Sequence, residues 1–169
     1  ILALVIQPKK KSNLKLLLAF SGSFLLSVTV ISLLPEVYET KNTTIGLYIM
    51  LGILFQIILE FFSKGAEHGH VHGHQTITHI PWLLFISLCI HALLEGFPVG
   101  HHHDLAIGIA IHHLPIAIIL TTFFVQAQLN KKAIFAFMIT FAMMTPLGTL
   151  ASNYIPGLQE YTTEITAIV

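Results

Sequence analysis

The stretch that decides the fold is IPWLLFISLCIHALLEGFPV, residues 80–99. It is almost wholly apolar over its 20 residues, about the length that a helix needs to cross the hydrocarbon core of a bilayer. It nevertheless carries His91 and Glu95 in the middle of the run. A buried helix of a soluble protein would explain one such stretch equally well, so the rest of the chain has to decide between the two.

Composition favours the membrane. Of 169 residues, 54% are hydrophobic and only 9% are charged, against about 25% charged in a typical soluble domain. Further apolar runs cover residues 14–35, 45–62, 104–126 and 132–151. We therefore expect an all-α, polytopic membrane helix bundle that forms a single transmembrane domain over 1–169. Residues 1–7 and 161–169 look like parts of further spans, and we expect this to be a partial chain.

The charged residues exclude several functions and predict an orientation. The net charge is zero with neutral histidines, and all eight basic residues are lysines, which argues against nucleic acid as a partner. One cysteine excludes an internal disulfide and a cysteine-based zinc finger. If successive connectors alternate sides of the membrane, seven of the lysines share one side and Lys41 lies on the other. The positive-inside rule makes the lysine-rich side cytoplasmic. The seven lysines are Lys9, Lys10, Lys11, Lys15, Lys64, Lys131 and Lys132.

Ionisable groups at bilayer depth are costly and by default mark function. On a helix, positions i and i+4 share a face, so His91 and Glu95 stack, with Ser87 one turn below. In the run 45–62, Gln56 and Glu60 also stand one turn apart. We expect that either could face a pathway, but Glu60 is close enough to the helix end to be solvated.

The next run contains His112 and His113, which point about 100° apart around a helix axis. We expect Pro115 to open the helix locally, so that both histidines address one site. Imidazole nitrogens and a carboxylate oxygen are typical ligands of zinc and similar divalent ions. A helix–helix hydrogen bond would explain a lone histidine, but four such groups on adjacent helices favour a metal site made of His91, Glu95, His112 and His113.

Two further groups of histidines lie in the connectors. The loop 63–79 interleaves histidine with glycine and is expected to be a cytoplasmic, auxiliary metal-capturing loop, or a solvated loop without a role. The connector after residue 99 could be a metal-collecting mouth or an ordinary interfacial loop. The auxiliary candidates are His68, His70, His72, His74 and His79 in the first group, and His101, His102, His103 and Asp104 in the second.

Taken together, these segments resemble the ZIP family of zinc and iron transporters. "HALLEG" is similar to the family's fourth-helix pattern H-N-x-x-[DE]-G, and "HHLPIA" is similar to its fifth-helix H-E-x-P-H-E. "SLLPE" at 32–36 and "TPLG" at 145–148 look like its second-helix and sixth-helix motifs. The resemblance implies a ZIP-like fold, with about six of the family's eight helices present. It also implies transport of divalent metal into the cytoplasm through a site between the fourth and fifth helices.

Carried over position by position, the resemblance makes His91, Glu95 and His112 primary-site ligands, and His113 a match for a secondary-site acidic ligand. The chain departs from the family pattern at four positions: Ala92 for asparagine, Ile116 for a glutamate that bridges two metals in bacterial relatives, Ala117 for a polar residue, and Ser32 for histidine. These departures argue against a two-metal site.

The function that we expect is transport of zinc as the substrate, with iron, manganese, cadmium or other divalent cations as alternatives. The expected surroundings are a lipid bilayer, and a homodimer is left open. A different reading is an intramembrane zinc hydrolase of the ceramidase and adiponectin-receptor kind, which could use Ser87 and Asp104. A di-iron hydroxylase and a metal-sensing or metal-storing protein are further alternatives. Metal flux into liposomes, compared with turnover of a lipid, separates these classes.

Overall fold

The computed structural model describes residues 11–40, 43–63, 81–100 and 103–169, and in these ranges the chain consists of helices joined by short turns, without strands. The all-α class predicted from composition is confirmed. The elements in chain order are α2 (Lys11–Val28), a π-helical turn (Thr29–Leu33), α3 (Leu34–Glu39), α4 (Ile45–Ser63), α5 (Trp82–Val99), α6 (His103–Gln126), α7 (Lys131–Tyr154), a 3-10 turn (Gln159–Tyr161) and α8 (Thr162–Ile168).

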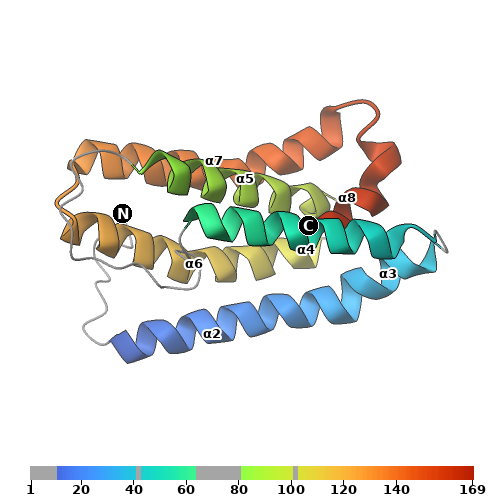
Figure 1. Cartoon of the computed structure of the whole chain (residues 1–169), viewed down its shortest axis with the longest axis horizontal. Helices are drawn as coiled ribbons and strands as arrows, with labels where there is room; N and C mark the ends of the chain where they lie inside the picture. The colour runs from blue at the N-terminus through green and yellow to red at the C-terminus, as the bar shows by residue number, and fades with distance from the viewer. Residues whose placement is uncertain (1–10, 41–42, 64–80, 101–102) are drawn as a thin grey trace.

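Within the described residues, five helical stretches are long and apolar enough to cross a membrane. They are Lys15–Glu39, Ile45–Phe62, Trp82–Val99, Leu105–Val125 and Lys131–Tyr154. The long helices run up and down alternately, with the starts of α2 and α7 at one end of the bundle and α3 and α8 at the other (Figure 1). The chain is thus a polytopic helical bundle. The span expected at 1–7 and nearly all of the loop expected at 63–79 lie outside the described residues.

The first span does not end at Pro35, where the apolar run predicted its end, but continues to Glu39. Pro35 has no N–H to donate to the carbonyl four residues earlier, and its ring crowds the preceding turn. The chain widens there into the π-helical turn, in which the N–H of Leu34 donates to the carbonyl of Thr29. The wider turn accommodates the proline, and the helix resumes as α3.

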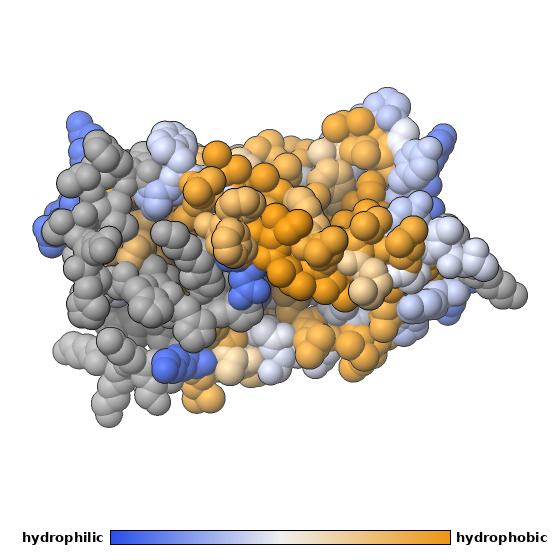
Figure 2. Space-filling view, viewed as in Figure 1, coloured by the Kyte–Doolittle hydropathy of each residue, from blue (hydrophilic) through white to orange (hydrophobic). Residues whose placement is uncertain are grey.

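The outer surface of the bundle is apolar where a membrane protein meets lipid. On α4 the exposed side chains include Leu47, Met50, Ile53, Leu54, Ile57 and Phe61. Figure 2 shows this apolar surface as a band across the middle of the molecule, with hydrophilic residues toward the two ends. In hydrocarbon, exposed apolar side chains cost no free energy. The helices are therefore held together by packing and hydrogen bonds and not by a hydrophobic driving force.

Among the described helices, α5 and α7 share the most extensive contact, and glycine makes their close approach possible. A Cβ atom built on Gly96 would lie 3.0 Å from the Cα of Gly148, and it would overlap the carbonyl oxygen of Thr145. A Cβ on Gly148 would overlap the carbonyl of Leu93 in the same way. The hydroxyl of Thr149 donates to the carbonyl of Gly96 at 2.9 Å, which adds a hydrogen bond between the helices. The two backbones therefore lie in contact around Gly96 and Gly148.

Toward the end of the bundle where α7 starts, the core is filled by aromatic and aliphatic side chains of α5, α6 and α7. Leu88, Leu120 and Phe124 are completely buried, and the rings of Phe124 and Phe137 meet edge to face with centroids 4.7 Å apart. At the opposite end, α8 packs on α4, where a Cβ on Gly52 would overlap the backbone of Ile168. The polar residues of the middle section are thus enclosed between two packed ends.

We predict that Gly148→Ala destabilises the protein by about 1–3 kcal/mol, because a methyl group has no room between α7 and α5. Gly22→Ala is the matched control, since a Cβ there meets nothing within 4 Å. Thermal unfolding in detergent micelles should show a lower midpoint for Gly148→Ala and an unchanged or higher one for Gly22→Ala. Equal midpoints for the two variants would show that the α5–α7 contact is looser than described.

Candidate metal centre

The site begins with two residues of one helix. His91 and Glu95 stand one turn apart on α5, with His91 Nε2 at 3.1 Å from Glu95 Oε1. Glu95 is 6% exposed, so its charge has to be compensated by groups close to it. The i,i+4 pairing that the sequence predicts is thus present, and it lies in the interior of the bundle.

Helix α6 adds a third donor. One ligand atom each from His91, Glu95 and His112 lies within 4.8 Å of the others, a spacing that could hold a metal ion. Donor atoms around a tetrahedral zinc lie about 3.3 Å apart, so the widest separation between the three donors would need to shorten by up to about 1.5 Å. The two imidazoles and one carboxylate are a donor set that suits zinc and its divalent neighbours.

His113 reaches the same carboxylate from another side. Its Nε2 lies 2.9 Å from Glu95 Oε2, and its ring packs edge-on against Phe141 with centroids 5.3 Å apart. The sequence led us to expect that α6 must open at Pro115 before both histidines could serve one site. The expected opening is absent, because α6 is a continuous helix through Pro115. Both histidines nevertheless come close to Glu95: His113 meets Oε2, and a ligand atom of His112 lies within 4.8 Å of one of Glu95.

The amide of Gln56, on α4, completes the surroundings of His91. Gln56 Oε1 lies 2.8 Å from His91 Nδ1. The roles in this pair depend on the tautomer of the ring: an Nδ1–H would donate to Oε1, because a carbonyl oxygen can only accept. In that tautomer the Nε2 atom of the neutral ring presents its lone pair toward Glu95 Oε1, 3.1 Å away. Two acceptors at this distance repel each other unless a proton or a cation lies between them.

Ser87 lies outside the site, although the sequence places it on the same stripe of α5. Its hydroxyl is buried and donates to the carbonyl of Leu84 at 3.1 Å, within its own helix. The auxiliary candidates of both connectors are not placed here: His68, His70, His72, His74, His79, His101 and His102 lie outside the described residues, as do the side chains of His103 and Asp104.

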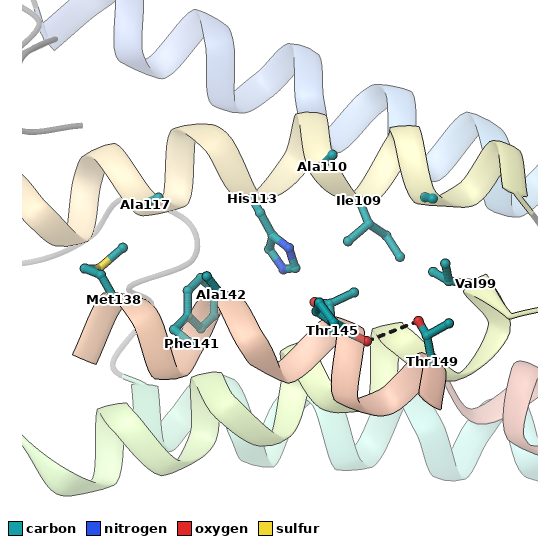
Figure 3. A pocket seen from close by; sticks show the side chains of 12 residues that line it. Val99, Ile109, Ala110, His113, Ala117, Met138, Phe141, Ala142, Thr145 and Thr149 are labelled. Atoms are coloured by element: carbon teal, nitrogen blue, oxygen red, sulfur yellow. Dashed lines mark hydrogen bonds between the residues drawn. The ribbon is translucent and has the colours of Figure 1, made fainter. Parts of the chain in front are cut away.

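Two cavities meet the site. One of about 440 Å³ is lined by Gln56 and Glu95 and extends to Val37, Thr166 and Val169 at the α3 and α8 end of the bundle. The other, about 370 Å³, lies between α6 and α7 and is mainly apolar. Figure 3 shows the His113 ring directed into this second cavity, toward α7. The carboxylate therefore borders one cavity and its partner histidine the other.

Comparison with known proteins gives a consistent result. The chain is 25% identical to zinc transporter ZIP1 of Danio rerio over 110 residues, which covers 51% of this chain and 36% of that protein. It is 28% identical to protein zntD of Dictyostelium discoideum over 112 residues, covering 56% of this chain and 16% of that protein. These matches support a relation to the ZIP zinc transporters. The chain spans about a third and about a sixth of the length of these two relatives. No family model and no solved structure matches it.

We predict that His91→Ala, Glu95→Ala and His112→Ala each weaken zinc binding at least about 100-fold, since loss of a ligand should exceed the 10–100-fold effect of outer-shell changes. Calorimetric titration would use chain whose histidines at 68–79 and 101–103 are replaced by serine. Ser87→Ala is the control on the same helix and should bind like the parent. Undiminished binding by Glu95→Ala would remove the carboxylate from the site.

Proposed function

We propose that the protein carries divalent metal cations, zinc foremost, across a membrane and into the cytoplasm. The observation that carries the proposal is the convergence of His91, Glu95 and His112 within 4.8 Å inside an apolar helical bundle. The similarity to zinc transporters supports zinc as the cargo. Imidazole and carboxylate also bind iron, manganese and cadmium, so competition among these ions is the measurement that ranks them.

The three grouped donors leave an ion room to exchange its ligands. Structural zinc sites close four positions with protein ligands, whereas sites with three protein ligands keep one position open. His91, Glu95 and His112 are three, and Glu95 borders a cavity of about 440 Å³ through which an ion or water could reach the open position. An ion with an open position and an adjacent cavity can exchange its ligands, as transport requires.

The proposed direction, into the cytoplasm, is supported by a difference between the two ends of the bundle. Lys15, Lys131 and Lys132 lie at the end where α2 and α7 start (Figure 1), and a lysine-rich end is cytoplasmic by the positive-inside rule. The 440 Å³ cavity extends from Glu95 toward the opposite end, to Thr166 and Val169 of the α8 region. We therefore assign this cavity to the side from which the ion enters.

The intramembrane hydrolase remains the second candidate function, and the geometry gives it less support. Such an enzyme needs an acid and a serine beside the metal-bound water. Ser87 instead donates to Leu84 within α5, away from the site. Turnover of a lipid or ceramide by the reconstituted chain, lost in Ser87→Ala, is the result that would favour the enzyme.

We predict that His91→Ala and Glu95→Ala reduce zinc uptake into cells or liposomes to below about a tenth of wild type at equal protein in the membrane, because a lost ligand costs more than an outer-shell change. Serine in place of His68, His70, His72, His74 and His79 should change uptake only several-fold, since a glycine-histidine tract can collect metal but cannot form the path. Uptake above half of wild type in both site variants would refute the proposed path.

We also predict one bound metal per pathway. One divalent ion beside the single carboxylate of Glu95 leaves one net positive charge, and a second ion would add two more in a low-dielectric interior. Ile116, which is 1% exposed, supplies no bridging oxygen at the position where the resemblance puts a bridging glutamate in bacterial relatives. Metal analysis of chain without the connector histidines should give a stoichiometry near one, rising toward two in Ile116→Glu. Two equivalents, both lost in Glu95→Ala, would contradict this prediction.

A further inference from the structure

We propose that Gln56 is a positioning residue for the metal centre, which holds the His91 ring in the tautomer and orientation that direct Nε2 at the metal position. The inference rests on the proposed function. It concerns a residue on a different helix from any of the ligand candidates, 35 positions before His91. Gln56 does not itself have to touch the ion.

The geometry is specific for one ring nitrogen. Gln56 Oε1 lies 2.8 Å from Nδ1 of His91, while Nε2 of the same ring lies 3.1 Å from Glu95 Oε1. A neutral imidazole has one N–H and one lone pair, and the hydrogen bond that one nitrogen makes determines which of them the other presents. With Nδ1–H donated to the amide, Nε2 faces the carboxylate with its lone pair free to coordinate.

The apolar surroundings of Gln56 make its hydrogen bond to His91 important for the stability of the amide. The cavity beside Glu95 has four α4 residues among its described lining, and three of them are Ile49, Ile53 and Ile57. Gln56 is the polar one, on a helix whose other exposed side chains are largely aliphatic or aromatic. An amide at membrane depth costs free energy unless it is paired, and its pairing with His91 offsets that cost. The amide can therefore order the ring before an ion arrives.

The expected loss of zinc affinity can be taken from groups that play a similar part beside other ligating histidines. Groups that fix the second nitrogen of a ligating histidine change metal affinity by about 10–100-fold when removed. Gln56→Met keeps the length of the side chain but removes the acceptor, so it should weaken zinc binding by that factor. Gln56→Glu keeps an acceptor oxygen and should bind within a few-fold of the parent or more tightly. Ile57→Leu, on the same helix and the same cavity, is the matched control and should bind unchanged.

The test uses the whole chain in detergent micelles, with the connector histidines replaced by serine. Zinc affinity is measured by competition, and the visible spectrum of bound Co²⁺ reports the ligand geometry. Ring ¹⁵N chemical shifts of His91, assigned by comparison with His91→Ala, report which nitrogen carries the hydrogen before metal is added. We expect the Nδ1–H tautomer in the parent and in Gln56→Glu, and a mixture of tautomers in Gln56→Met.

Two results would overturn the inference: the Nε2–H tautomer in the metal-free parent, or zinc affinity and Co²⁺ spectrum unchanged in Gln56→Met. The ring shifts of the parent do not depend on whether a variant folds, so the inference stays testable if Gln56→Met fails to fold. Failure of the proposed function has a different signature, which is a parent chain that binds no zinc or binds it equally well after His91→Ala. If zinc binding is lost in His91→Ala but kept in Gln56→Met, only the positioning role of Gln56 is contradicted.

Discussion

The contact on which the rest of the molecule depends is the one between the Glu95 carboxylate and the imidazoles on either side of it. A carboxylate at bilayer depth is stable only where it is paired, and each of its oxygens faces a histidine, His91 within α5 and His113 on α6. Because the partners come from two helices, the pairing ties α6 to α5 at the level of the site. The helix that bears the charge also has to be held where it cannot turn the carboxylate toward lipid.

Glycine supplies that restraint. Gly96, next to Glu95 in sequence, brings the backbone of α5 against Gly148 of α7, and the Thr149 hydroxyl bonds across the contact. Side chains larger than hydrogen would move the helices apart, and lipid offers no hydrophobic driving force to bring them back. With one face of α5 fixed on α7, its His91 and Glu95 side chains are available to α4 and α6. The site is therefore built from close packing on one side and polar pairing on the other.

Residue patterns predict a good part of this. The apolar runs and the scarcity of charge predicted an all-α membrane bundle, because the length of a span and the solvation of charge are properties of local sequence. The spacing of His91 and Glu95 predicted that they share a face, since i and i+4 always do on a helix. The histidine pair on α6 was harder. Its two rings diverge, and nothing local shows that both can come near one carboxylate of another helix while α6 stays unbroken, so the expected opening at Pro115 was wrong.

The sequence by itself determined which segments are apolar and long enough to lie in lipid, and which metal-binding groups they carry. These groups are a carboxylate and imidazoles inside the spans. What only the tertiary structure decided is which donors meet. Gln56 bonds to His91 across 35 residues, and Gly148 of the TPLG stretch meets Gly96 beside the HALLEG glutamate. Such pairings depend on how far each helix is rotated and shifted against its neighbour. In lipid those rotations are set by close packing and by a few hydrogen bonds summed over the whole bundle, and no single stretch of sequence contains that sum.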